Sequence, residues 1–123
     1  MSKLVIDVGQ CAPDHAAIRR MLDSHFDVRI VQTHGMDDTL AALAREPAEL
    51  VLVNRKLDRD YSDGTDIIRR IKSDDSVSSA PVMLVSNCPE HQRSAVQLGA
   101  EPGFGKAELD TDLTHAKLKA FLG

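Results

Sequence analysis

The sequence predicts an α/β fold in which a parallel sheet lies between two layers of helices. Apolar segments dense in Val, Ile and Leu recur at residues 4–8, 28–31, 50–53 and 82–85. Such segments, without alternating polar residues, are typical of strands buried on both faces. A stretch with helical periodicity follows each segment. This alternation favours a parallel sheet with right-handed crossovers.

Three helices are expected between these strands. In each of them, apolar residues gather on one face and polar residues occupy the rest. The residues that form these faces are Ile18, Met21 and Leu22, then Leu40 and Leu43, then Ile67, Ile68 and Ile71. The loop before the third helix ends in Asp63-Gly64, which is typical of a turn and a helix start.

The last third of the chain predicts two more helices around a fifth strand. Asn87 is expected to cap a helix whose first turn holds a proline and a glutamate. Gly99 stands where a helix end favours positive φ. Residues 102–105 form the predicted fifth strand, with glycines on both sides of Phe104. A final leucine-containing helix is expected to begin near Asp112, because acidic residues suit the positive end of a helix.

Composition indicates one globular domain, residues 1–123, with 42% hydrophobic and 28% charged residues. The net charge of −4 and the lack of a basic stripe argue against nucleic-acid binding. The apolar runs are far too short for a membrane span. Asp7 interrupts any apolar region of a signal peptide. Cys11 and Cys88 are expected to be free thiols, and we therefore expect a cytoplasmic protein.

Polar residues follow the predicted strands. Because sites in open parallel sheets form outside the carboxyl ends of the strands, these residues should share one edge. The residues concerned are Asp7 and Val8, Asn54, Ser86 and Asn87, and Gly105 with Lys106. We expect a pocket with a carboxylate, an amide, a hydroxyl and an ammonium group.

These residues, in this order, resemble the receiver domain of bacterial two-component response regulators, the family of the chemotaxis regulators. The segments DGTDIIRRIKSDDSVSSAPVMLVSN and LGAEPGFGKAEL are similar to the third helix with the fourth strand, and to the end of that domain. The resemblance covers nearly the whole chain. It implies a flavodoxin-like (βα)5 fold, a three-layer α/β sandwich with a five-stranded parallel sheet of order 2-1-3-4-5. It also implies a role in signal transduction and phosphorelay.

In that family, two acids at the end of the first strand hold Mg²⁺, and an aspartate ending the third strand accepts a phosphoryl group. A Ser or Thr and a Lys contact the phosphoryl oxygens. The resemblance assigns the first acid to Asp7, the hydroxyl to Ser86 and the lysine to Lys106. Val8 stands where the second acid belongs, and Asn54 falls on the phosphoacceptor position.

Two further positions depart from the family pattern. Gly103 replaces the aromatic switch residue three places before the lysine, and Ala107 replaces the proline after it. The loop from Asn54 to Gly64 is longer than the common pattern. A pocket changed at this many positions is expected to have lost its switch as well as its acceptor.

An amide cannot act as the ionised carboxylate nucleophile that phosphoryl transfer requires. With Asp7 opposite Lys106, the charge of the pocket is near zero, so Mg²⁺ binding is expected to be weak or absent, with no cofactor. We expect Lys106 to pair with Asp7. Asn54 should join the same cluster, together with Ser86.

The favoured hypothesis is an atypical receiver, or pseudo-receiver. It would be a non-enzymatic module that is not phosphorylated at the usual position and acts through protein–protein interaction. The surface that the resemblance implies includes Leu98, Phe104, Leu113 and Lys117. A signalling protein is the expected partner, and a homodimer is a further option.

Two alternatives stay open: an unusual phosphoacceptor, Asp58 or Asp60, or a small-anion site at the same pocket. The simpler interpretation makes both aspartates part of a solvated, flexible loop. The five histidines form no i, i+4 pairs and are expected to be solvated, without binding metal. The pattern of a cysteine-dependent phosphatase needs an arginine where Ala17 stands. No glycine-rich nucleotide motif occurs.

Overall fold

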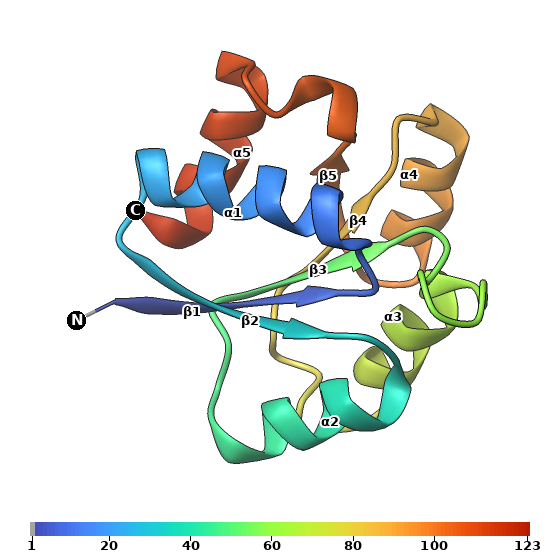
Figure 1. The fold of residues 1–123 in the computed structure, drawn as a ribbon. Helices are drawn as coiled ribbons and strands as arrows, with labels where there is room; N and C mark the ends of the chain where they lie inside the picture. Colours follow the sequence, from blue (N-terminus) through green and yellow to red (C-terminus); the bar gives the residue numbers. More distant parts are fainter. Residues whose placement is uncertain (1) are drawn as a thin grey trace.

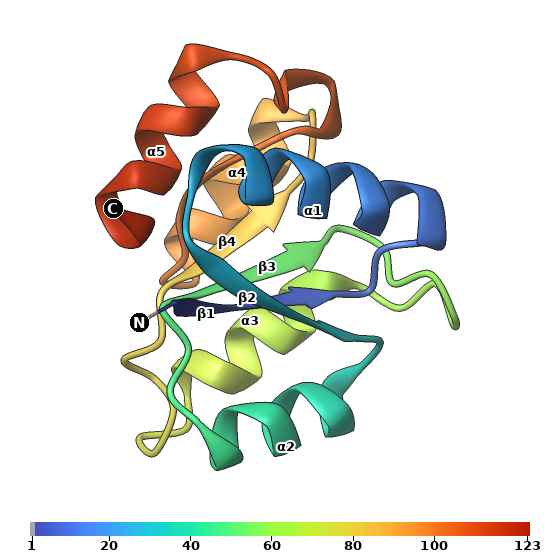
Figure 2. The same cartoon turned by 60° about the vertical axis from the view of Figure 1, so that its left-hand side comes forward.

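A computed structural model describes residues 2–123 and has the predicted architecture (Figures 1 and 2). Five parallel strands form one sheet in the order β2-β1-β3-β4-β5. The strands are β1 Lys3–Val8, β2 Val28–Thr33, β3 Leu50–Asn54, β4 Val82–Val85 and β5 Glu101–Phe104. The helices are α1 Ala12–His25, α2 Met36–Arg45, α3 Gly64–Lys72, α4 Pro89–Gln97 and α5 Asp112–Leu122, and a short 3-10 helix spans Lys106–Glu108.

Helices cover the sheet on both faces. Figures 1 and 2 show α1 and α5 on one face, and α2 and α3 on the other. In β3, Leu50 and Leu52 pack toward the α1/α5 face, whereas Val51 and Val53 pack toward α2 and α3. Since both faces are covered, the central strands are apolar throughout. Each such buried side chain contributes about 1.5–3 kcal/mol to stability.

Several predicted boundaries are confirmed and a few differ. Asp63 caps α3 through a hydrogen bond from Thr65 N to its Oδ1 (2.9 Å), and Gly99 has the expected positive φ of 107°. Asn87 was expected to cap α4, but the N-cap residue is Cys88. The Asn87 side chain turns instead toward the end of β5, where its Oδ1 accepts from Ala107 N (3.1 Å). Ala107 could not make this contact as a proline, which has no N–H.

The β4–β5 pairing contains a bulge that the side chain of Gln92 bridges. Met83 pairs with Glu101 and Val85 with Phe104, so one residue of β4 lies opposite two residues of β5. Gln92, from α4, donates to Leu84 O (2.9 Å) and Ser86 O (3.1 Å) and accepts from Gly103 N (2.9 Å). A side-chain amide thus replaces backbone pairing that the bulge interrupts.

The bulge accounts for the glycine at position 103 and for the burial of Phe104. A Cβ atom on Gly103 would lie 2.2 Å from Leu84 O, so no larger residue fits without moving the strands. Phe104, predicted as part of the interaction surface, is only 1% exposed. It lies opposite Val85 and packs in the core beneath α1 and α5, so the prediction for Phe104 is wrong.

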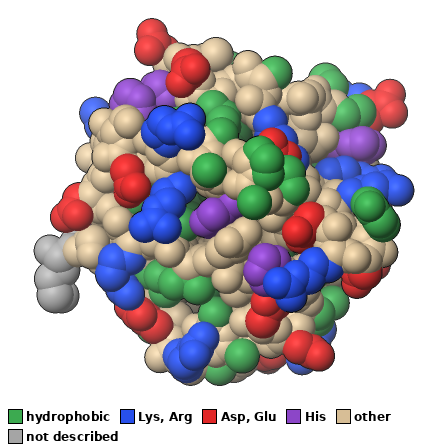
Figure 3. All heavy atoms as spheres, in the orientation of Figure 1, with side chains coloured by type: hydrophobic (Ala, Val, Ile, Leu, Met, Phe, Trp, Pro, Cys, Tyr) green, Lys and Arg blue, Asp and Glu red, His purple; other side chains and the backbone are tan. Residues whose placement is uncertain are grey.

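Charged side chains of both signs are interspersed on the face shown in Figure 3. Within residues 2–123, no helix combines the length and the apolar character needed to cross a membrane.

The Gln92 bridge predicts the effect of a near-isosteric substitution. Gln92→Met should lower the free energy of unfolding by about 2–4 kcal/mol, because Leu84 O and Gly103 N lose their hydrogen bonds in a partly buried position. Gln97→Met, an exposed change on the same helix, is the matched control and should cost less than about 0.5 kcal/mol. Urea denaturation measures both. Equal stability of the two variants would contradict the bridging role.

Candidate functional site

The predicted site residues lie along the carboxyl edge of the sheet, but they do not share one environment. Asp7, at the end of β1, is fully buried on the α1/α5 face. Val8, the next residue, is fully buried in the opposite core. Asn54, Ser86 and Lys106 are half-buried at the ends of their strands. The edge therefore exposes an amide, a hydroxyl and an ammonium group, while its one retained acid lies beneath α1.

The Asn54 side chain acts as a double hydrogen-bond donor. Its Nδ2 donates to Gly9 O (3.0 Å) and to Lys56 O (2.7 Å). The reverse amide orientation would place the side-chain oxygen against two carbonyl oxygens, so the surroundings require the nitrogen there. An aspartate has no N–H to offer these carbonyls, and an ionised one would repel them. The amide is therefore the group that this position needs.

The loop after Asn54 folds back onto the end of β1. Leu57 is buried and packs against Gly9, where an added Cβ would lie 2.4 Å from Leu57 Cδ2. Gly9 has a positive φ of 75°, and its carbonyl oxygen also accepts from Asp58 N (3.0 Å). Leu57 anchors the start of this segment by apolar packing, whereas residues 59–62 are exposed, as expected for a solvated loop.

Asp7 is held by His15, on the first turn of α1. His15 Nδ1 and Asp7 Oδ2 are 2.6 Å apart. Burial raises the pKa of Asp7 to about 6, although the hydrogen bond and charge of His15 act to lower it. Within the described residues, Asp7 Oδ1 has no hydrogen-bond partner, and neither does the buried side-chain amide of Gln10.

Lys106 does not pair with Asp7, contrary to expectation. Its Nζ donates to Asp14 Oδ2 at 2.7 Å, across to the first turn of α1. This hydrogen bond is the main cause that holds the pKa of Asp14 below its ordinary value. Asp7 has His15 as its hydrogen-bond partner instead. Asp7 and Asp14 therefore contact two different basic side chains, His15 and Lys106 respectively.

Ser86 faces α4 and does not contact Asn54 as expected. Its Oγ lies 3.1 Å from His91 Nδ1 and accepts from Cys88 N (3.2 Å). The hydroxyl thus stabilises the first turn of α4.

Of the two aspartates considered as unusual acceptors, Asp60 is hydrogen-bonded within the loop, whereas Asp58 Oδ1 has no hydrogen-bond partner among the described residues. Asp60 Oδ1 accepts from Ser62 N (2.9 Å) and Ser62 Oγ (2.6 Å). Asp58 Oδ1 lies 3.8 Å from His34 Nδ1. Lys106 instead has Asp14 as its carboxylate partner. The retained lysine is therefore not shared with either loop aspartate.

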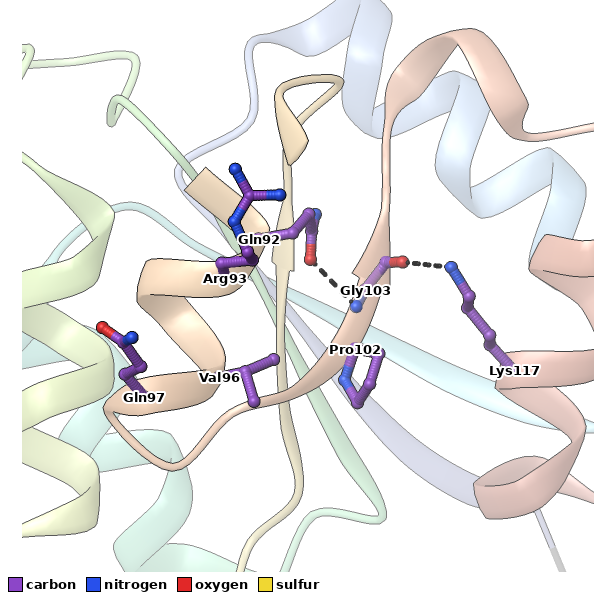
Figure 4. A pocket seen from close by; sticks show the side chains of 7 residues that line it. All are labelled: Gln92, Arg93, Val96, Gln97, Pro102, Gly103 and Lys117. Carbon is purple, nitrogen blue, oxygen red and sulfur yellow. Dashed lines mark hydrogen bonds between the residues drawn. The ribbon is translucent and has the colours of Figure 1, made fainter. Parts of the chain in front are cut away.

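The residues predicted for an interaction surface divide into two groups. Leu113 and Lys117, four residues apart on α5, lie on one face of that helix, and Leu113 is 60% exposed. Leu98 is half-buried and packs against the core, and Phe104 lies within it. Of the four, Leu113 is exposed, whereas Lys117 is half-buried like Leu98 and donates from Nζ to Gly103 O (2.9 Å; Figure 4).

Comparison with solved structures identifies the fold. The signal receiver domain of a DNA-binding response regulator from Colwellia psychrerythraea 34H has a TM-score of 0.79 at 21% identity over 97% of each chain. The BeF3-activated DrrB receiver domain gives 0.74 at 20% identity, over 98% of this chain and 97% of that one. The chain has the fold of a receiver domain. The Mn²⁺-bound form of response regulator Rcp1 gives 0.73 at 15% identity, over 98% and 94%. No family model and no curated protein sequence matches the chain.

Within this receiver fold, sequence reasoning missed the partners of the site residues. Asp14 was not singled out, and His15 and His91 were expected to be solvated. The involvement of Asp14 and His15 could have been predicted from their positions, since the first turn of the helix after β1 lies over the same edge of the sheet. His91 carried no such indication, because its role depends on the side-chain direction of Ser86.

The donor role of Asn54 predicts that Asn54→Asp destabilises the protein by about 1–3 kcal/mol at pH 7, because two hydrogen bonds are lost and a charge faces two carbonyl oxygens. Asn87→Asp is the matched control. Asn87 accepts through Oδ1, and a carboxylate can still accept there. Urea denaturation compares the two variants. An Asn54→Asp variant with the unfolding free energy of the wild type would show that the amide nitrogen is not required.

The buried carboxyl predicts a pH dependence. Since the pKa of folded Asp7 lies near 6, above the ordinary 3.8, the folded state holds more protons than the unfolded state between those values. This group therefore makes stability fall as pH rises from about 4 to about 6. Relative to wild type, Asp7→Asn should gain up to about 3 kcal/mol of unfolding free energy across that window.

Asp14→Asn is the contrasting variant for the same pH series. The pKa of Asp14 is lowered by Lys106, so its contribution is present above its ordinary pKa and is lost as pH falls. Asp14→Asn should therefore lose stability relative to wild type as pH rises. If the unfolding free energies of the two variants changed with pH in the same way, the Asp7–His15 and Asp14–Lys106 pairs would be contradicted.

Proposed function

We propose that the protein is an atypical receiver of two-component-type signalling that is not phosphorylated at the usual position and acts through protein–protein contact. The observation that carries this proposal is the Asn54 amide, which donates to Gly9 O and Lys56 O where an acceptor carboxylate would have to be free. The fold shared with receiver domains supplies the signalling context. A non-enzymatic, cytoplasmic, bacterial module is part of the same proposal.

The proposal includes weak or absent Mg²⁺ binding. Asp7 offers one unpaired buried oxygen, next to the neutral amide of Gln10, and Val8 adds only apolar surface. Mg²⁺ dehydrates reluctantly and usually takes one or two carboxylates beside its waters. This donor set does not fit such an ion, so no step of the proposed function uses one.

Activity through contact fits the way in which the polar residues of the edge are used. Lys106 is bound to Asp14, and Ser86 contacts His91, so the groups that would hold a phosphoryl oxygen already have partners from α1 and α4. These contacts favour a single state of the domain over a phosphorylation switch. They also leave the Lys106 ammonium group bound to Asp14 and not free for a small anion.

Treatment with acetyl phosphate, or with beryllofluoride, plus Mg²⁺ tests the proposal. We expect no phosphoryl adduct in the intact mass and no large amide NMR shifts around Asn54 and Ser86. The DrrB receiver domain, known in a BeF3-activated form, is the positive control. Asn54→Asp should gain little phosphorylation, because Val8 leaves the metal site one acid short. A phosphoryl adduct on the wild-type protein would overturn the proposal.

A further inference from the structure

Two histidines from different helices meet at the C-terminal end of α1. His25 stands in the last turn of α1 and His115 near the start of α5, and Figures 1 and 2 show these two helices side by side. The centroids of the two rings are 3.9 Å apart, and the ring planes are tilted by 34°. At 1.5 Å per residue, His25 lies about 15 Å along α1 from His15. The pair is therefore separate from the residues of the carboxyl edge.

The backbone fixes which nitrogen of His115 is basic. Nε2 of His115 lies 2.8 Å from Leu109 O, and because a carbonyl oxygen only accepts, Nε2 carries the proton. The neutral ring then has its lone pair on Nδ1. A histidine that binds a metal ion usually donates its other ring N–H to a carbonyl or carboxylate oxygen in this way. Leu109 O thus holds His115 in the tautomer that suits a metal ligand.

A hollow beside the pair gives an ion access to both rings. The residues that line this hollow of ≈ 380 Å³ include His25, His115 and Lys119. His25 is exposed, so its ring is free to turn, while the hydrogen bond to Leu109 O holds the ring of His115. An ion that binds two imidazoles at about 2.0–2.1 Å holds their nitrogens no more than about 4 Å apart. The separation of the two rings is of that order.

Side chains of both charges surround the pair. Lys119 lines the same hollow and opposes a cation. A neighbouring hollow, which His25 also lines, adds Arg20 and Asp110, which have opposite signs. The C-terminal end of α1 carries the negative end of a helix dipole, which favours a cation. With no strongly negative field, an ion must be held by bonds to nitrogen, and this requirement disfavours Mg²⁺, which takes hard oxygen ligands.

We infer that His25 and His115 bind a divalent transition-metal ion such as Ni²⁺ or Zn²⁺, with water in its remaining coordination positions. Imidazole nitrogen is a ligand that suits these ions. Within residues 2–123, no group of three or more His, Cys, Asp or Glu side chains gathers for a metal ion, so the protein supplies two ligands only. The bound ion joins the end of α1 to α5. This site goes beyond the proposed function and uses no residue of the carboxyl edge.

An NMR titration of the untagged protein with Ni²⁺ tests the inference, at about pH 7.5, where an ordinary imidazole is neutral. Paramagnetic broadening should begin at the side-chain signals of His25 and His115, and calorimetry should give one ion per chain. Mg²⁺ at the same concentration should leave these signals unchanged. Broadening that begins at any other histidine would overturn the inference.

Histidine-to-phenylalanine variants separate metal binding from packing. His25→Phe and His115→Phe keep an aromatic ring in the contact between α1 and α5 but remove the nitrogen ligands. Each should weaken Ni²⁺ binding at least about tenfold. His91→Phe, which removes a histidine from α4, is the matched control and should bind as wild type does. Lys119→Gln should strengthen binding by about threefold, because it removes an opposing charge at an exposed position.

Two further results would overturn the inference. One is unchanged Ni²⁺ affinity in the two ligand variants, with circular dichroism verifying that both are folded. The other is one ion bound by two chains, measured by sedimentation, which would assign the imidazoles to an interface between copies of the chain. Neither result involves phosphorylation, so failure of this test leaves the proposed function standing.

Discussion

Two backbone carbonyl oxygens, from Gly9 and Lys56, converge on the amide nitrogen of Asn54, and the carboxyl edge of the sheet is organised around this contact. The amide joins the end of β1 to the loop after β3. That loop places Leu57 over Gly9 and removes it from solvent. An N–H donor is required at the meeting point, because two carbonyl oxygens cannot satisfy each other. The amide therefore helps the packing of Leu57 to hold the loop against β1, and it leaves no carboxylate nucleophile at this position.

Three other polar side chains of the edge each contact a residue of a neighbouring helix. His15 holds Asp7, Asp14 holds Lys106, and His91 contacts Ser86. In a pocket that binds an exogenous phosphoryl group, such side chains would need to be free or to exchange partners. Here the partners belong to the fold itself. At the β5 edge of the sheet, Gln92 and Lys117 fix Gly103, the position that the resemblance assigns to an aromatic switch residue.

The sheet and its helices could be predicted from the sequence, because strands covered on both faces are apolar throughout and the helices keep one apolar face. The bulge in β5 could not. Its strand has few apolar residues, and a side chain of α4, eleven positions from Gly103, bridges it. The edge residues could be located by their place after each strand. Their partners could not, since Lys106 and Asp14 are 92 positions apart and either of two acids could have paired with the lysine.

The central claim is that the Asn54 amide occupies the place where a receiver would need a free carboxylate and a metal ion. The most direct measurement follows the side-chain NH₂ resonances of Asn54 by NMR during a titration with Mg²⁺. We expect both amide protons to be protected from exchange with water and their shifts to stay constant up to millimolar Mg²⁺. Rapidly exchanging protons, or shifts that saturate with Mg²⁺, would contradict the claim.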